Sequence, residues 1–124
     1  MNRLKNKNMK KYMLISFLLL GFVASSIAQE PASKKKTVQT TFWVNGICDM
    51  CQTRIQKAAL STKGVKMASW HIERKMLTVL YNQKKCSVLD IKNSIAAVGH
   101  DSKDVKATDE AYDNLHFCCM YERE

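Results

Sequence analysis

Two cysteines at CxxC spacing, Cys48 and Cys51, are the residues of this chain best suited to chemistry. They follow a β-rich run that ends at Asn45-Gly46, a pair that interrupts strands. A helical i, i+3, i+4 spacing of apolar residues begins at Ile55, which places Cys51 near the first turn of a helix. Free N–H groups and the positive end of the helix dipole favour thiolate over thiol at such a position. Two thiolates this close suit a soft metal ion or reversible disulfide chemistry.

A second set of candidate ligands lies at the C-terminus, where Cys118 and Cys119 are adjacent and His116 is close by. Neighbouring cysteines are poorly suited to bonding each other, because a vicinal disulfide strains the backbone between them. As ligands they would complete the CxxC site, giving three or four nitrogen and sulfur ligands that suit Zn(II) or clustered Cu(I), or they would form a separate site. The alternative is an apolar tail in which Phe117, Cys118 and Tyr121 pack onto the sheet.

The N-terminus has the pattern of a secretory signal peptide. Residues 1–12 carry five bases and no acid, residues 13–23 are apolar, and the small residues Ser26 and Ala28 precede Gln29. We therefore predict a signal peptide over residues 1–28, cleaved after Ala28, and a periplasmic or secreted protein without a stable membrane anchor. The rival interpretation is an uncleaved anchor, but the apolar run is shorter than the roughly 20 residues that a spanning helix needs.

Charge and cysteine usage limit the classes of function. The formal charge of +9 comes largely from the five bases of the signal and from Lys34-Lys35-Lys36 in a linker. A nucleic-acid binder would need a basic face with interleaved aromatic residues, so we expect no nucleic-acid partner. Five cysteines in an exported chain would ordinarily suggest disulfides, but the number is odd and neither close pair would staple a long loop.

The order of predicted elements indicates an α+β protein with a ferredoxin-like βαββαβ sandwich, an antiparallel sheet with two helices on one face. After a disordered linker at residues 29–36 we expect a domain at 37–107, then a C-terminal helix and a Cys-rich tail at 108–124. The predicted strands are 37–44, 65–71, 76–81 and 104–107. Three helices are predicted. The first runs from the CxxC loop to residue 62, the second begins at a Ser87–Asp90 capping box and ends before Gly99, and the third spans residues 108–115.

Residues 38 to about 107 resemble a heavy-metal-associated domain, the module of copper chaperones, metal-pump N-termini and periplasmic mercury-binding proteins. The resemblance rests on the CxxC that opens the first helix, on the strand–helix order, and on Gly99-His100-Asp101, which is similar to a loop that approaches the metal from the far side. One departure concerns the metal loop. The family reads Gly-Met-x-Cys-x-x-Cys with a buried methionine, whereas here Ile47 directly precedes Cys48.

The resemblance implies roles for residues around the thiols. His100, in the facing loop, would be a third ligand, tune the site, or be an exposed polar residue. Met50 would shape or shield the loop. Cys86 is interpreted as a buried free thiol and His71 as structural.

We therefore expect a small exported carrier or buffer that holds a soft cation, most simply Cu(I), through Cys48 and Cys51. Hg(II) and Zn(II) are the alternative metals, and a metal-transporting or metal-receiving protein is the expected partner. A local disulfide is the competing state of the thiols. The alternative of another class is a thiol-disulfide oxidoreductase, disfavoured because the thioredoxin-like fold sets a cis-proline against its cysteines and the only proline here is Pro31. No acid–base pair, nucleophile triad or phosphate loop indicates an enzyme.

Overall fold

The computed structural model describes residues 36–124, so the predicted signal peptide and nearly all of the predicted linker lie outside the described residues. The elements, in chain order, are β1 (Thr37–Trp43), α2 (Asp49–Ser61), β2 (Val65–His71), β3 (Met76–Asn82), α3 (Val88–Ala97), α4 (Asp109–Asp113) and the 3-10 turn η1 (Phe117–Cys119). No helix within residues 36–124 has the length and apolar character needed to cross a membrane.

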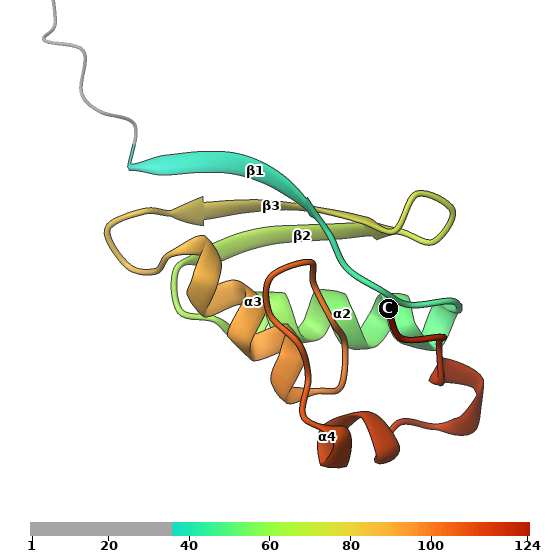
Figure 1. Ribbon diagram of the computed structural model, residues 1–124. Coiled ribbons are helices and arrows are strands. Elements are labelled where there is room, and N and C mark those ends of the chain that lie inside the picture. The colour runs from blue at the N-terminus through green and yellow to red at the C-terminus, as the bar shows by residue number, and fades with distance from the viewer. Residues whose placement is uncertain (1–35) are drawn as a thin grey trace, which may run out of the picture. The chain divides into compact units, whose positions relative to one another are not determined.

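The strands form an antiparallel sheet in the order β1-β3-β2, and α2 and α3 cover one of its faces (Figure 1). β3 is therefore the central strand. Its pairing with β1 runs from Thr37 opposite Asn82 to Trp43 opposite Met76, and a hairpin joins it to β2. This arrangement confirms the ferredoxin-like α+β fold expected from the sequence.

The core lies between the sheet and the two helices. Leu77, Val79 and Tyr81 alternate along β3 and are buried, as the period of two requires for the face that the helices cover. Ile55 of α2 and Ile91 of α3 are fully buried against them. Each such side chain contributes roughly 1.5–3 kcal/mol when removed from water, so this layer is the main source of stability for the scaffold.

The helix boundaries follow from local capping. The Ser87 hydroxyl accepts the N–H of Asp90, and the Asp90 carboxylate accepts the N–H of Ser87 at 2.7 Å, which confirms the predicted capping box at the start of α3. Gly99 follows α3 with φ of +101°, and a Cβ there would lie 2.6 Å from a carbonyl oxygen of α4. Glycine is thus required both for the turn and for the close approach of the tail.

The predicted fourth strand at residues 104–107 is wrong. Among the described residues, residues 104–107 form no strand, and the nearby chain is joined to the end of β1 only by an isolated bridge between Val44 and Ser102. The last residue of the segment donates its N–H to Asp101 Oδ1 (2.7 Å), and its carbonyl accepts a bond from Arg123 Nη2 (2.7 Å). Side chains therefore take the hydrogen bonds that a strand ladder would have used.

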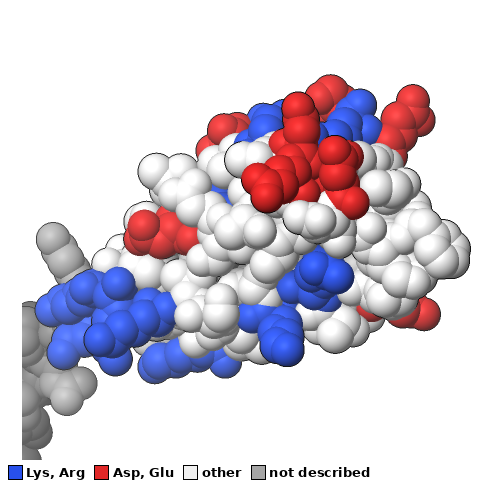
Figure 2. All heavy atoms as spheres, turned by 90° about the horizontal axis from the view of Figure 1, so that it is seen from below, with Lys and Arg blue, Asp and Glu red and all other residues white. Residues whose placement is uncertain are grey.

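The chain then turns back on itself. α4 begins after Thr108, whose hydroxyl accepts an N–H of the first turn, within the range predicted for a helix. From there the tail runs to the N-terminal end of α2, where η1 contacts that helix (Figure 1). On the face seen in Figure 2, basic side chains gather at the lower left, while the acidic side chains gather mainly toward the top, where basic side chains lie beside them. Asp109 and Glu110 stand in the first turn of α4.

Candidate metal centre

Four of the five cysteines meet where the tail crosses the start of α2. Cys48 Sγ lies 3.1 Å from Cys51 Sγ, 3.3 Å from Cys119 Sγ and 4.0 Å from Cys118 Sγ. The two tail sulfurs are 3.9 Å apart. All of these thiols are free in the structure. Cys48 is therefore the central sulfur of a cluster to which the loop and the tail each contribute two thiols.

Cys48 is also the thiol best placed to ionise. It is the N-cap of α2, and its Sγ accepts the N–H of Cys51 at 3.4 Å. Burial opposes ionisation, but hydrogen bonds from the thiol and N–H of Cys51, and from the thiols of Cys119 and Cys118, outweigh it and lower the pKa of Cys48. Burial raises the pKa of Cys51 and that of Cys119, where contact with Cys48 and Cys51 raises it further. The lowered pKa favours the thiolate form of Cys48.

Two further side chains that could donate to a metal, a histidine and a methionine, lie beside Cys118. His116 Nδ1 lies 3.2 Å from Cys118 Sγ, as the sequence analysis anticipated for this residue. Met50 Sδ lies 3.3 Å from the same sulfur, so this methionine contacts the cluster directly. Phe117 is 80% exposed, and the alternative in which it packs onto the sheet is wrong, whereas Tyr121 is buried as that alternative expected.

His100 is not one of the residues in the close group of thiols. Its ring is fully buried, stacks on Tyr121 at 5.5 Å between centroids, and donates from Nδ1 to the carbonyl of Asn45 (2.8 Å). Burial lowers the pKa of His100, which favours the neutral ring, and Nε2 has no hydrogen-bond partner among residues 36–124. The thiols of Cys48, Cys118 and Cys119 form a close group that does not include this histidine.

Cys86 and His71 also lie outside the cluster. Cys86 is buried, its Sγ lies close to Gly64, and burial raises its pKa. These observations agree with the prediction of a buried free thiol. His71 is exposed at the end of β2.

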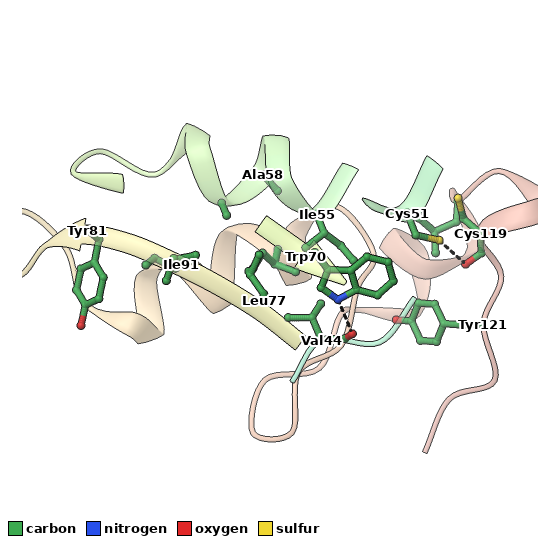
Figure 3. Close-up of a cluster of buried hydrophobic side chains, with 14 of the residues drawn as sticks. Val44, Cys51, Ile55, Ala58, Trp70, Leu77, Tyr81, Ile91, Cys119 and Tyr121 are labelled. Atoms are coloured by element: carbon green, nitrogen blue, oxygen red, sulfur yellow. Dashed lines mark hydrogen bonds between the residues drawn. The ribbon is translucent and has the colours of Figure 1, made fainter. Parts of the chain in front are cut away.

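Trp70 supports the metal loop from the core (Figure 3). Its side chain is fully buried, and Nε1 donates to the carbonyl of Val44 at 3.0 Å. A Cβ added at Gly46 would lie 3.0 Å from the indole ring and 3.1 Å from the Cβ of Cys51. Any side chain at residue 46 would therefore press against the indole and the Cys51 side chain. Trp70 therefore supplies large apolar packing beneath the CxxC loop.

Arg123, near the end of the tail, forms an ion pair that the sequence analysis missed. Its guanidinium donates to both carboxylate oxygens of Asp101 at 2.9 Å and to Asp109 Oδ1 at 3.0 Å. Burial would raise the pKa of Asp101, but the hydrogen bonds from Arg123 outweigh it and keep the pKa below its usual range. The carboxylate is therefore charged, and it binds the tail to the loop after α3.

Tyr121 and Asn45 complete this attachment. Tyr121 Oη donates to the Gly99 carbonyl (2.8 Å) and accepts the N–H of Asp101 (2.9 Å), while Asn45 Nδ2 donates to the Glu122 carbonyl (3.0 Å). A weak signal for this attachment was present in the sequence. Cys119, Tyr121 and Arg123 are each two residues apart, a spacing typical of an extended segment with one buried face.

We predict that Arg123→Ala lowers the free energy of unfolding by about 3 kcal/mol, the lower end of the range for breaking a buried ion pair. The reason is that the Asp101 side chain is 1% exposed and would lose its charged partner, whereas the Arg123 side chain is 24% exposed. Urea denaturation followed by circular dichroism measures the change. Glu124→Gln is the matched control, because its pair with Lys103 is exposed on both sides and its loss should change stability far less. Equal effects of both variants would contradict the prediction.

The fold and the thiols can now be compared with known proteins. No protein-family model matches the chain, and neither does any curated protein sequence. Solved structures do match. A CopZ metallochaperone is similar at 27% identity and a TM-score of 0.51, covering 52% of this chain and 98% of its own. The oxidized MerP from Ralstonia metallidurans CH34 is similar at 25% identity and a TM-score of 0.50, covering 55% and 99%.

A third similar structure is the N-terminal domain of a potential copper-translocating P-type ATPase from Bacillus subtilis, in the Cu(I)-loaded state. It has 29% identity and a TM-score of 0.50, and the match covers 56% of this chain and 94% of that domain. The similarity thus extends over nearly the whole of each small domain and about half of this chain. Together with the cysteine cluster, it supports the presence of a domain like the heavy-metal-associated domains.

Proposed function

We propose that this protein, which contains a heavy-metal-associated-like domain, carries a soft metal ion, Cu(I), and hands it over to a metal-transporting or metal-receiving protein. The observation that carries the proposal is the convergence of three other thiols on Cys48, whose pKa is lowered. Thiolates select Cu(I), Zn(II) and similar ions over hard cations. The Cu(I)-loaded pump domain among the similar structures supports copper, and Hg(II) and Zn(II) stay the alternative metals.

The surroundings of the thiols suit hand-over to a protein partner. Large apolar side chains next to the cysteines are exposed: Ile47 and Met50 beside the loop thiols, and Phe117 and Met120 beside the tail thiols. Exposed apolar groups next to a functional site are typical of surfaces that bind other proteins. Contact there would exclude water while an incoming thiolate of the partner replaces one of the bound thiolates.

The location and the non-catalytic role are parts of the same proposal. We infer export from the signal pattern of residues 1–28, which predicts a mature N-terminus at Gln29. N-terminal sequencing of the protein recovered from the periplasm or medium tests this inference. The carrier role predicts one-to-one exchange of metal and no catalytic turnover. Catalysis of disulfide reduction by the protein would instead favour the oxidoreductase alternative.

The decisive experiment is anaerobic titration of the fully reduced protein with Cu(I) against a chromophoric Cu(I) chelator. We expect tight, stoichiometric binding of Cu(I), with Zn(II) and Hg(II) as comparison metals. Transfer of the bound ion to a separately purified metal-pump domain, followed after rapid separation of the two proteins, measures hand-over. A reduced protein that binds none of these metals tightly would overturn the carrier proposal.

A further inference from the structure

We propose that the ion is held by three thiolates, those of Cys48, Cys118 and Cys119, rather than by the CxxC pair alone. This inference rests on the proposed function and specifies the geometry of its site. Cys48 is then the single loop ligand, and the C-terminal tail supplies the other two.

The positions of the three sulfurs carry the inference. Their separations are 3.3 Å (Cys48–Cys119), 4.0 Å (Cys48–Cys118) and 3.9 Å (Cys118–Cys119). An ion at the centre of this triangle would lie about 2.2 Å from each sulfur, close to the ~2.3 Å length of a metal–thiolate bond. Trigonal coordination with bonds of ~2.3 Å needs sulfurs about 4.0 Å apart. Two of the three separations have this value, and the Cys48–Cys119 separation of 3.3 Å needs only to widen slightly.

The CxxC pair does not have the spacing for an ion between its two sulfurs. Linear coordination needs sulfurs about 4.6 Å apart, twice the metal–sulfur bond, whereas Cys48 Sγ and Cys51 Sγ are 3.1 Å apart. Cys51 is also fully buried, and its Sγ is directed at the carbonyl of Cys119, at 3.9 Å (Figure 3). Cys51 therefore acts as a hydrogen-bonding neighbour of Cys48, and the pair would have to open before it could bind an ion by itself.

The tail is held in place by contacts independent of the metal. The bonds of Arg123 with Asp101, and those of Tyr121 with Gly99 and Asp101, fix the residues directly after Cys119. Two ligands are thus positioned before the ion arrives, which reduces the entropy lost on binding. The vicinal arrangement also disfavours a disulfide between the two tail cysteines.

Binding and release follow from this geometry without any redox step. When Cu(I) binds, the three thiols lose their protons to solvent and three copper–sulfur bonds form. Cys119 is fully buried, whereas Cys118 is partly exposed between Met50 and His116. An incoming thiolate would therefore displace Cys118 first, so the tail controls the exit of the ion.

Serine substitutions separate this site from a CxxC-only site. In competition titrations with Cu(I), we expect Cys118→Ser/Cys119→Ser to lower the affinity by more than about 100-fold. Cys51→Ser should lower the Cu(I) affinity by less than about tenfold. Removing a residue that only supports a ligand typically costs roughly 10–100-fold, so the expected loss is no larger than the low end of that range. Cys86→Ser, a buried cysteine outside the cluster, is the matched control and should bind like the unsubstituted protein. Circular dichroism and thermal unfolding of each variant check that it is folded.

X-ray absorption spectroscopy of the copper-loaded protein gives a readout that does not depend on variants. We expect three sulfur neighbours around copper, falling to two in Cys118→Ser/Cys119→Ser. If the unsubstituted protein shows two sulfurs, and Cys51→Ser alone removes binding, the three-thiolate site is refuted while the carrier function stands. If the unsubstituted protein takes up no copper, the proposed function itself fails.

Discussion

Cys48→Ser is expected to abolish tight Cu(I) binding, with a loss of affinity greater than roughly 100-fold. This exceeds the roughly 10–100-fold loss caused by removing a residue that only supports a ligand. The physical reason is that Cys48 is the one sulfur shared by every arrangement that the cluster allows. It lies within 4.0 Å of each of the other three thiols of the cluster, and its pKa is lowered by their hydrogen bonds. Removing it leaves the tail thiols without the loop sulfur that lies nearest to both of them. Competition titration under anaerobic conditions measures the loss.

The fold should tolerate this change, which makes the result interpretable. Cys48 is the N-cap of α2, and serine is a favoured residue at that position, so the helix should still begin at Asp49. We therefore expect the unfolding midpoint of Cys48→Ser to stay close to that of the unsubstituted protein. A variant that is folded and binds Cu(I) with unchanged affinity would contradict both the carrier proposal and the three-thiolate site.

Trp70→Ala is expected to cause the largest loss of stability of any single truncation in the core, about 3–5 kcal/mol. The indole is the largest fully buried side chain in residues 36–124, and its Nε1 bonds the carbonyl of Val44 where β1 ends. Its removal would open a cavity between the sheet and α2 and would also remove the surface on which Gly46 rests. We therefore predict weaker Cu(I) binding even in conditions where the variant is still folded.

Trp43→Ala is the matched control for that experiment. Trp43 lies on β1, is only partly buried, and has Lys103 Nζ 4.3 Å from the centre of its ring. The same substitution there removes as many atoms but leaves no closed cavity, so the loss in urea denaturation should be clearly smaller. Equal losses at the two positions would show that Trp70 has no special role beneath the metal loop.

Several features of this protein depend on short stretches of sequence, and these were predicted correctly. The alternation along β3, the Ser87–Asp90 capping box and the glycine after α3 each act within a few residues, so their patterns are legible without the fold. The same holds for the CxxC at the start of α2, because helix N-caps and N–H groups are set locally. These signals were sufficient to predict the elements from β1 to α3 and the place of the two loop thiols at the start of α2.

The sequence by itself therefore determined where the two loop thiols lie and the scaffold that presents them, whereas the tertiary structure decided which other groups reach them. Cys48 and Cys119 are 71 residues apart, and Arg123 binds Asp101 across 22 residues. No periodic pattern encodes such pairs, because they depend on how the tail packs after the sheet and helices have formed. The same packing buried His100 outside the close group of thiols and replaced the expected fourth strand with side-chain bonds. Long-range contacts of this kind are selected by the free energy of the whole packed domain, and so they appear only in the folded structure.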